Sequence, residues 1–513
     1  VLRGQVPFAR GIDFSDIFTG KWGFDIIVGN PPYVRQEAIE DPTWMIKDKK
    51  DYKNLLVDVV NQDWFDDVKK HRKDELKIGW RSDLYLYFYF RGLKLLNTDW
   101  VFTFITSNSW LDVDFGSVLQ EFLIKYCPSI KIFDNQVQRS FSSASINTIM
   151  CFFDKPVIDS KDIMSGNAQF VNFNKPYEES VWTETMAELD HQAINKKFDS
   201  KEIKTGEVFF TKRLTDELRV IDINTKNLWI DWSELVSKDW LEIRKYEGNK
   251  WWGIFLRANN IYFKLLEKWS QKWLLTKIEN LVENVITWVK DWWYNKYIKR
   301  IEQNFDKNMW LSILKNVKSH FFIKISNFDS YIPYEFSETI SKNKHKIANI
   351  LWTSMKWERY LTFECNQKTL FTWNFIWINA FESNKTEIVI LLNSTLSHLF
   401  GEIFGRQMFW EWSICLWKSD LLKMNLFFNK KIELKINEIK SDLFNREIKS
   451  IFEEIWIDKT KCIRSQTPNP LTDRKKLDDI IFDELGLTQE ERNEVYRSLA
   501  ELVKARLDKA KSV

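Results

Sequence analysis

Residues 24–34 read Phe-Asp-Ile-Ile-Val-Gly-Asn-Pro-Pro-Tyr-Val, and they decide how the first part of the chain folds. An apolar run that ends at Gly29 is typical of a buried strand. That strand delivers the tetrapeptide Asn30–Tyr33 at its carboxyl end, where open α/β sheets hold their ligands. The alternative is a proline-rich turn that merely closes a strand, but the preceding strand signal favours a binding site at the edge of a sheet.

Further strands and helices follow this segment. The expected strands are 100–106, 130–134 and 146–153, and the expected helices are 83–96, capped by Ser82, and 115–126. Strands that alternate with helices predict an open, largely parallel sheet. Residues 1–155 are therefore expected to form an α/β domain.

Three regions follow that domain. Residues 156–270 are polar and mixed and predict a connector, and residues 271–435 combine short strands and helices with aromatic and basic side chains. Residues 436–513 predict a charged helical tail, in which Thr488-x-x-Glu491 forms a capping box. An apolar stripe then follows at helical spacing, formed by Val495, Leu499, Leu502 and Leu507.

Composition excludes several classes of protein. The 513 residues include 75 Lys and Arg against 72 Asp and Glu, so any basic surface for nucleic acid must be local. Five scattered cysteines without a CxxC pair exclude a disulfide scaffold and suit a reducing cytoplasm, which is where we expect the protein. The five histidines lack metal-ligand spacing, which predicts no metal. No apolar run of about 18 residues occurs, which predicts no membrane span.

Glycine and tryptophan are present in unusual numbers, 15 and 26. Average usage would give about 7% glycine, and several tryptophans, such as Trp373 and Trp377, stand where glycine would be expected. We infer that many of these residues are glycines in the source cells, encoded by UGA; UGG codons would contradict this. Trp110 and Trp252 are expected to be genuine. The alternative is an aromatic-rich surface that stacks on bases.

The Asn-Pro-Pro-Tyr tetrapeptide suits one kind of chemistry. The lone pair of an amino group on an aromatic ring is delocalised, so such a nitrogen is a poor nucleophile. The side-chain oxygen of Asn30 and the carbonyl of Pro31 can accept both of its N–H bonds and free that lone pair. Pro31 and Pro32 stiffen the corner, and Tyr33 can stack on the ring. The pattern predicts direct attack of an amino nitrogen on an electrophilic methyl group.

With these motifs the sequence resembles the gamma-group N6-adenine DNA methyltransferases of bacterial restriction–modification systems. The resemblance is carried by Asn30–Tyr33 and by Ile12-Asp13-Phe14, residues 82–85, residues 104–111 and residues 141–150. It implies a partial Rossmann-like methyltransferase sheet, an α+β target recognition domain at 271–435 and a helical tail. It also implies S-adenosyl-L-methionine as cofactor, double-stranded DNA as partner, and a restriction endonuclease as a fused domain or separate subunit.

The resemblance also assigns roles to individual residues. Asp13, with Asp16 as the alternative, would contact the adenine of the cofactor, and Phe141 would join Tyr33 in gripping a flipped base. The segments 392–407 and 418–424 resemble parts of the specificity domain.

Four basic residues are candidates for DNA contacts. Lys296 and Arg300 lie in a stretch of interleaved basic and aromatic residues that either meets phosphates or forms a solvated turn. Arg406 would reach a base edge or a phosphate, or else form a salt bridge within its domain. Lys418 completes the set by resemblance.

One departure from the family concerns the cofactor. The family places a glycine-rich loop for S-adenosylmethionine before the Asn-Pro-Pro-Tyr motif, and the 29 residues before Asn30 contain none. The expectation is a truncated fragment, inactive by itself, of an active enzyme.

Two other functions remain open. One is a non-catalytic DNA-binding specificity subunit. The other is methylation of a protein glutamine, whose enzymes also carry Asn-Pro-Pro-Tyr but are much shorter. Cytosine-N4 enzymes usually carry Ser in place of Asn30.

Overall fold

A computed structural model gives the fold of the chain. It describes residues 17, 23–72, 76–135, 147–159, 163–177, 199–205, 208–214, 218–238, 241–246, 248, 250–270, 275–286, 299–300, 309–314, 324–325, 330–333, 348–353, 355–356, 358–371, 375–407, 414–416, 420–421, 424–427, 432, 435–436, 439 and 442–511.

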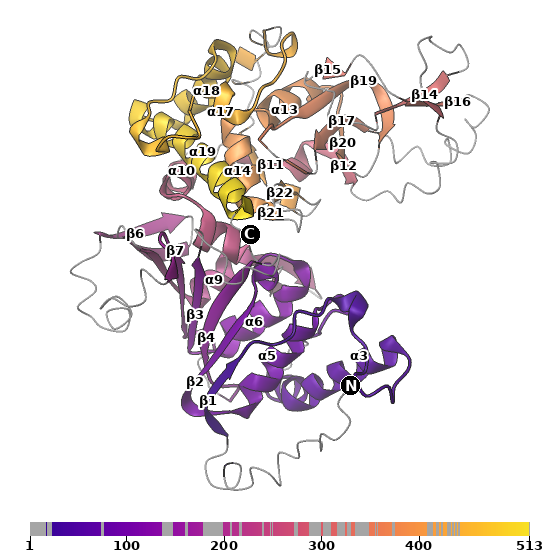
Figure 1. The fold of residues 1–513 in the computed structure, drawn as a ribbon, viewed down its shortest axis with the longest axis vertical. Coiled ribbons are helices and arrows are strands. Elements are labelled where there is room, and N and C mark those ends of the chain that lie inside the picture. The colour runs from indigo at the N-terminus through magenta and orange to yellow at the C-terminus, as the bar shows by residue number, and fades with distance from the viewer. Residues whose placement is uncertain are drawn as a thin grey trace. The chain divides into compact units, whose positions relative to one another are not determined.

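The chain divides into two compact units, which we call unit 1, Val1–Arg257, and unit 2, Ala258–Ser512 (Figure 1). The boundary falls inside the region 156–270 that the sequence assigned to a connector. Much of that region is part of unit 1, because its strands pair with the first sheet.

An eight-stranded sheet forms the centre of unit 1, in the order β1-β2-β4-β3-β5-β8-β7-β6. Its strands are β1 (Phe24–Gly29), β2 (Leu96–Ser107), β3 (Ser129–Asn135), β4 (Thr148–Asp154), β5 (Asn167–Phe173), β6 (Asp199–Thr205), β7 (Val208–Leu214) and β8 (Leu218–Asn224). A separate hairpin pairs β9 (Ser233–Lys238) with β10 (Leu241–Tyr246).

The direction of these strands is mixed. β1, β2, β3 and β5 run one way, as a largely parallel sheet requires, but β4 runs the opposite way between β2 and β3. β8, β7 and β6 extend the sheet through antiparallel pairings. The α/β class is therefore confirmed, while the sheet is longer and less parallel than the sequence predicted.

The helices of unit 1 are α3 (Lys49–Val60), α4 (Asp66–Arg72), α5 (Leu84–Leu95), α6 (Ser117–Tyr126) and α9 (Thr225–Trp232). α5 and α6 lie within two residues of their predicted bounds. The predicted cap of α5 is wrong by one residue, since Asp83 rather than Ser82 is its N-cap. Ser82 is instead buried, and its hydroxyl has no hydrogen-bond partner in the part of the chain that the structure describes.

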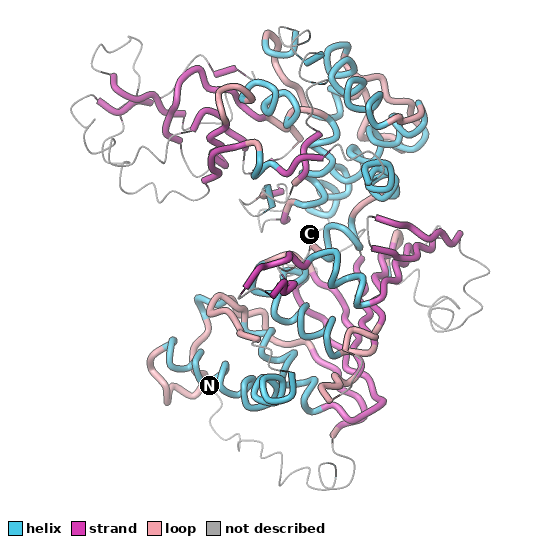
Figure 2. Tube along the Cα trace, turned by 180° about the vertical axis from the view of Figure 1, so that it is seen from behind, coloured by secondary structure: helices cyan, strands magenta, loops and turns pink. Residues whose placement is uncertain are grey.

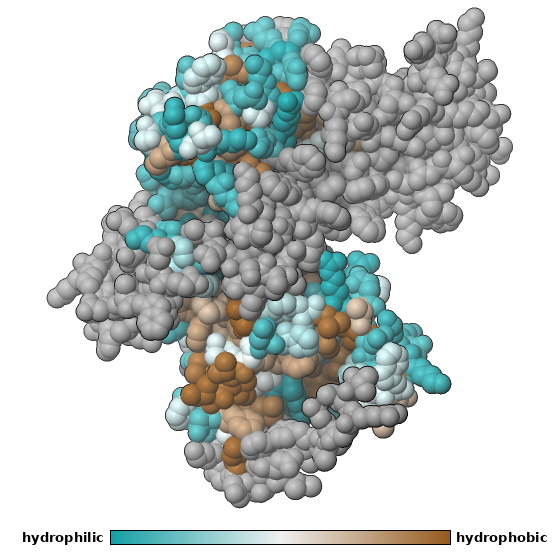
Figure 3. Space-filling model, in the orientation of Figure 1, coloured by the Kyte–Doolittle hydropathy of each residue, from teal (hydrophilic) through white to brown (hydrophobic). Residues whose placement is uncertain are grey.

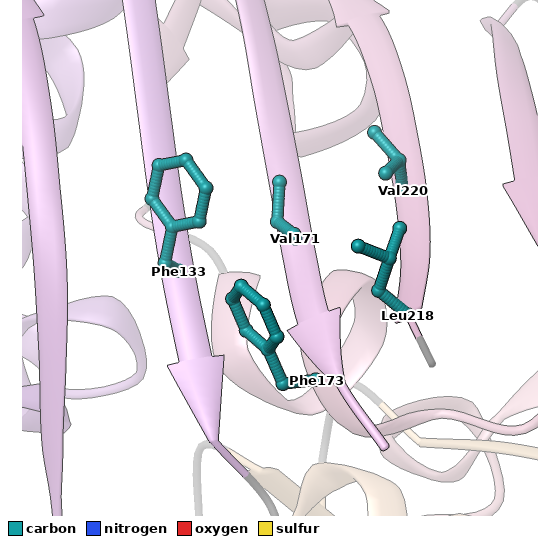
Figure 4. Packing of buried hydrophobic residues seen from close by; sticks show 5 residues of the cluster. All are labelled: Phe133, Val171, Phe173, Leu218 and Val220. Carbon is teal, nitrogen blue, oxygen red and sulfur yellow. The ribbon is translucent and has the colours of Figure 1, made fainter. Parts of the chain in front are cut away.

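The two faces of the sheet pack differently. On one face the ring of Tyr89 from α5 lies 5.3 Å from that of Phe104 and 5.9 Å from that of Phe153. On the other face a smaller apolar cluster joins β3, β5 and β8, formed by Phe133, Val171, Phe173, Leu218 and Val220 (Figure 4). Figure 2 shows the helices of unit 1 gathered mainly on one side of its strands.

β1 has only one neighbour among the described strands, and its Ile26 and Val28 side chains are 56% and 76% exposed. Figure 3 shows a hydrophobic surface over this end of the sheet.

Unit 2 combines sheets with helices. Its helices are α10 (Asn260–Ser270), α13 (Lys385–Leu392), α14 (Thr395–Phe404), α17 (Ile451–Glu454), α18 (Thr472–Leu485) and α19 (Gln489–Lys511). Its strands are β11 (Leu275–Lys277), β12 (Val282–Ile286), β13 (Lys299–Arg300), β14 (Met309–Leu314), β15 (Lys324–Ile325), β16 (Ser330–Pro333), β17 (Ala348–Thr353), β18 (Met355–Lys356), β19 (Thr362–Phe371), β20 (Phe375–Ala380), β21 (Arg406–Gln407), β22 (Ile414–Cys415) and β23 (Asn425–Phe427).

The helical tail of unit 2 has the predicted local features. The Thr488 N–H donates to Glu491 at 2.9 Å and the Glu491 N–H donates to Thr488 at 3.3 Å, so the capping box is confirmed. The apolar stripe that begins at Val495 is buried, and α19 packs on α14 and α10.

Two tryptophans adopt a backbone conformation that favours glycine. Trp44 has a φ of 61° and Trp456 a φ of 56°, and both side chains are mostly exposed. At the end of α17, Trp456 donates to the Glu453 carbonyl and Ile457 to the Phe452 carbonyl. The same pair of bonds ends α18, where Gly486 occupies the equivalent position with a φ of 65°. These positions support the inference that some tryptophans stand where the source protein has glycine.

Other tryptophans do not fit that inference. Trp377 was inferred to stand in place of a glycine, but it lies inside β20, pairs with Leu351 and is 2% exposed. Trp110 and Trp252 are buried, as expected of genuine tryptophans. Trp373 lies outside the described residues.

We expect the Trp456→Gly substitution to raise the free energy of unfolding by about 1 kcal/mol, because a side chain in the left-handed region costs about 1–2 kcal/mol, partly offset by the greater entropy that glycine loses on folding. The converse substitution Gly486→Trp should destabilise by a similar amount. Urea unfolding measures both, and a loss of stability in Trp456→Gly would contradict this account of the motif.

Within the described part of the chain, no single helix is long and apolar enough to cross a membrane, although α13 and α14 together, bent by 70°, reach that length and composition.

Candidate functional site

The Asn-Pro-Pro-Tyr corner lies where β1 ends. β1 and β2 are parallel neighbours, and β3 and β5 end at the same edge, while β4 begins there. Asn30 is exposed at this edge, whereas Pro31 is buried. The corner therefore lies at the carboxyl end of a strand, as predicted.

Gly29 lets the corner approach β2 closely. Gly29 pairs with Phe104, and a Cβ at position 29 would lie 2.6 Å from the Phe104 ring. A side chain at this position would push β1 away from β2.

Tyr33 is anchored through its hydroxyl. The Tyr33 Oη donates to the carbonyl oxygen of Ile105 in β2 at 3.1 Å. Burial raises the pKa of Tyr33 to about 12, so the hydroxyl stays protonated and keeps donating. The hydrogen bond fixes the half-buried ring beside the end of β2.

The start of α5 holds the other end of the loop. The Leu84 N–H donates to the Val34 carbonyl at 2.9 Å, and the Gln36 N–H donates to Asp83 Oδ1 at 3.1 Å. Burial raises the pKa of Asp83 from 3.8 to about 6, although the bond from Gln36 and the charge of Arg35 oppose that rise.

The raised pKa of Asp83 predicts a specific pH dependence. Between about pH 6 and pH 4 the folded protein binds a proton at Asp83 that the unfolded chain does not bind. The stability of the wild type relative to Asp83→Asn should therefore rise as the pH falls from 7 through 6 towards 4. Urea unfolding of both proteins across this range measures the difference, and a difference that stays constant with pH would contradict the desolvation of Asp83.

A row of buried polar residues crosses the sheet near the same edge. Register carries the row through Thr106, Asp134, Asn172 and Arg219, with Ile149 between the first two. Trp252 Nε1 donates to Asp134 Oδ2 at 2.7 Å, while Asp134 Oδ1 and Asn172 Oδ1 have no hydrogen-bond partner among the described residues. Sequence reasoning missed this row, because the pairing that aligns its members is visible only in the folded sheet.

Several of the other predicted site residues fall in segments that the structure does not describe. Asp13, Asp16, Phe141, Lys296 and Lys418 lie outside the described residues.

The two remaining basic candidates lie in unit 2. Arg300 lies in the short strand β13. Arg406 is largely buried and forms an ion pair with Asp420 at 3.2 Å, which matches the salt-bridge alternative for this residue.

The segment 392–396 has a structural role in unit 2. The Asn393 side chain accepts the Thr362 N–H at 3.1 Å and donates to the Thr362 and Val389 carbonyls. Asn393 thereby ties the end of α13 to β19. The Ser394 side chain caps α14.

No group of three or more His, Cys, Asp or Glu residues that could hold a metal ion occurs in the part of the chain that the structure describes.

Comparison with known proteins relates the first part of the chain to restriction-modification methylases. Residues 3–141 match the Eco57I restriction-modification methylase family. The Type II methyltransferase M.BstVI of Geobacillus stearothermophilus is 32% identical over 100 residues, which are 20% of this chain and 14% of that protein. The N-terminal part of the chain is thus related to the methyltransferases of restriction–modification systems, and the match spans a small part of the relative's length.

Solved structures with partial likeness include the type IIG restriction endonuclease BpuSI, with a TM-score of 0.37 and 10% identity over 94% of this chain and 54% of that one. The Type IIL restriction-modification enzyme MmeI, solved in complex with DNA, has a TM-score of 0.42 and 14% identity over 96% of this chain and 59% of that one. Both TM-scores are below 0.5, so the relation to methylases rests on the match of residues 3–141.

The described residues do not supply a pocket for S-adenosylmethionine. A methylase implies a methyl donor, but no described strand of unit 1 leads into a glycine-rich turn that could cradle that cofactor, and Asp13 lies outside the described residues. The candidate site that the described residues do show is the Asn30–Tyr33 corner at the end of β1.

Proposed function

We propose that the chain is part of a site-specific DNA methyltransferase that methylates the N6 amino group of a flipped adenine within a restriction–modification system. The observation that carries the proposal is the Asn-Pro-Pro-Tyr corner at the carboxyl end of β1, held against β2 by Tyr33. The match of residues 3–141 to a methylase family supports it. S-adenosylmethionine would supply the electrophilic methyl group.

The corner would act on the acceptor nitrogen. The Asn30 side-chain oxygen and the Pro31 carbonyl would each accept one N–H of the adenine amino group, which draws the nitrogen towards a tetrahedral shape and frees its lone pair. The rigid corner would hold these acceptors in place, so that positioning supplies most of the rate enhancement. Transfer would form the N6–methyl bond and break the methyl–sulfonium bond of the donor, and the excess proton on N6 would then pass to water, since neither amide oxygen is basic enough to keep it.

Extrusion of the base would bring it to the exposed Asn30. Tyr33 is fixed by its hydroxyl, so its ring would offer a preset surface to the purine. Phe141 would grip the other part of the ring. Unit 2 would choose the DNA sequence, with Lys296 and Arg300 as candidate phosphate contacts and Lys418 as a further candidate DNA contact.

A non-catalytic specificity subunit is the second candidate, favoured by the absence of a cofactor cradle among the described residues. Such a subunit would bind a defined DNA sequence without modifying it. A methyltransferase for protein glutamine would use the same corner, because a side-chain amide is also a planar conjugated nitrogen.

Labelled S-adenosylmethionine distinguishes these functions. The full-length protein is incubated with labelled cofactor and either duplex DNA or a glutamine-containing protein, and the products are hydrolysed and separated. The proposal predicts label in N6-methyladenine. Label in N4-methylcytosine or in methylglutamine, or specific DNA binding without any label, would overturn it in favour of the corresponding alternative.

A further inference from the structure

We propose that Asp83 is a positioning residue of the acceptor site: its carboxylate holds the Asn30–Gln36 loop in the arrangement that presents Asn30 and the Pro31 carbonyl to the substrate nitrogen. This inference rests on the proposed function and names a residue outside the Asn-Pro-Pro-Tyr corner.

The first support is that the Asp83 side chain makes no hydrogen bond to its own helix. It is the N-cap of α5, with φ −71° and ψ 156°, yet its side chain makes no capping hydrogen bond. An aspartate at this position normally accepts an N–H from the first turn, which contributes about 1 kcal/mol. Asp83 Oδ1 instead accepts the Gln36 N–H at 3.1 Å. The side chain is therefore used to hold the loop at the expense of its helix.

The second support is the distribution of anchors along the loop. Pro31 and Pro32 have no N–H, so two of the four residues of the corner offer no backbone donor that could tether it. The tethers come immediately after it, from Tyr33 to Ile105, from Leu84 to Val34, and from Gln36 to Asp83. Two of these three bonds depend on consecutive residues at the start of α5, so the position of the corner follows the position of that helix end.

The third support is that burial makes the charged carboxylate of Asp83 energetically unfavourable at this position. Burial raises its pKa, which means that the charged form is penalised relative to water. Arg35 and Lys53 lie close enough to favour the charge, whereas Glu37 opposes it. A partly buried charge with perturbed pKa beside a reaction site is typical of a functional residue, and a charged acceptor gives a stronger hydrogen bond to the loop than a neutral one.

The test compares Asp83→Ala with Asp83→Asn in the full-length protein, because asparagine retains an oxygen that can accept the Gln36 N–H. Asp41→Ala is the matched control. Asp41 accepts the Thr43 N–H at 2.9 Å and the Ile46 N–H at 2.8 Å in the next turn, and it makes no bond to the Asn30–Gln36 loop. Hydrogen exchange of peptides covering residues 30–38, single-turnover methylation and DNA affinity are measured for each variant.

Asp83→Ala should raise exchange in residues 30–38 and lower the methylation rate about 10–100-fold, since a small misplacement of reacting groups has effects of this size. DNA affinity should change less than about 2-fold, so the loss appears in the rate and not in binding. Asp83→Asn should keep loop protection and most of the rate, and Asp41→Ala should keep both.

Two results would overturn the inference. One is unchanged exchange of residues 30–38 in Asp83→Ala, and the other is an Asp83→Ala methylation rate equal to that of Asp41→Ala. A wild-type protein that methylates nothing would instead overturn the proposed function, and the exchange measurement would still decide whether Asp83 holds the loop.

Discussion

The Asn30→Ala variant of the full-length protein is expected to methylate DNA about 10²–10³-fold more slowly than the wild type, the size of effect seen when one preorganised polar group is removed from a reaction site. Asn30 is exposed at the end of β1, so its truncation removes no packing. In the proposed mechanism, the substitution removes one hydrogen-bond acceptor for the substrate amino group. Specific DNA binding should persist, because the proposed DNA contacts Lys296, Arg300 and Lys418 lie elsewhere in the chain.

Asn469→Ala is the matched control for this experiment. Asn469 is also exposed and also precedes a proline, but it lies in unit 2, in the loop that leads into α18. Its methylation rate should equal that of the wild type. Single-turnover kinetics and a DNA-binding titration measure both variants, and equal loss of rate and binding in Asn30→Ala would point to misfolding instead of lost chemistry.

The Glu402→Ala substitution should lower the free energy of unfolding of unit 2 by about 3–5 kcal/mol, the cost of leaving a buried charge without its partner. Glu402 on α14 and Arg506 on α19 are both fully buried, and their ion pair spans 2.9 Å. Tyr360 also donates its hydroxyl to Glu402. Burial, and then the charge of Glu402, raise the pKa of Tyr360 well above its usual value, so the tyrosine remains a donor.

Urea unfolding measures this effect against Lys461→Ala, which removes an exposed pair with Asp458 at 3.4 Å. The exposed pair should contribute less than about 1 kcal/mol. Replacement of Glu402 and Arg506 together by methionine should recover most of the loss, because no unpaired charge then remains. A Glu402→Ala variant as stable as Lys461→Ala would contradict this account.

Local signals in the sequence were sufficient to place the Asn-Pro-Pro-Tyr corner at the end of a strand. An apolar run closed by Gly29 predicted β1 with its observed bounds, and prolines at 31 and 32 marked where the strand ends. The start of α5 was less certain from sequence, because Ser82 and Asp83 are both good N-caps. Only the fold reveals that Asp83 is the cap residue and that its side chain is bound to the loop.

Long-range pairing could not be predicted in the same way. β4 has an ordinary strand sequence, and nothing in it indicates that it runs antiparallel between β2 and β3. The strands β5 and β8 were assigned to a connector, because polar residues surround them in the sequence. Their pairing within the sheet is visible only in the folded structure. The polar row that includes Asp134 and Asn172 depends on that pairing.

Charge alone also could not identify DNA contacts. Arg406 is basic and lies in a segment that resembles a specificity domain, yet it pairs with Asp420, fourteen positions further along the chain. An arginine has the same appearance in a sequence whether it faces a carboxylate or a phosphate. Tryptophan at position 456 shows the opposite case, since composition raised the suspicion and a positive φ supports it.

A structure of the full-length protein bound to duplex DNA that contains its target adenine tests the central claim most directly. The distances to be measured run from the adenine N6 atom to the Asn30 side-chain oxygen and to the Pro31 carbonyl oxygen. The account predicts an extruded adenine with both distances at about 2.7–3.2 Å. An adenine that remains stacked in the duplex, or one bound with its N6 atom beyond hydrogen-bond reach of both oxygens, would contradict it.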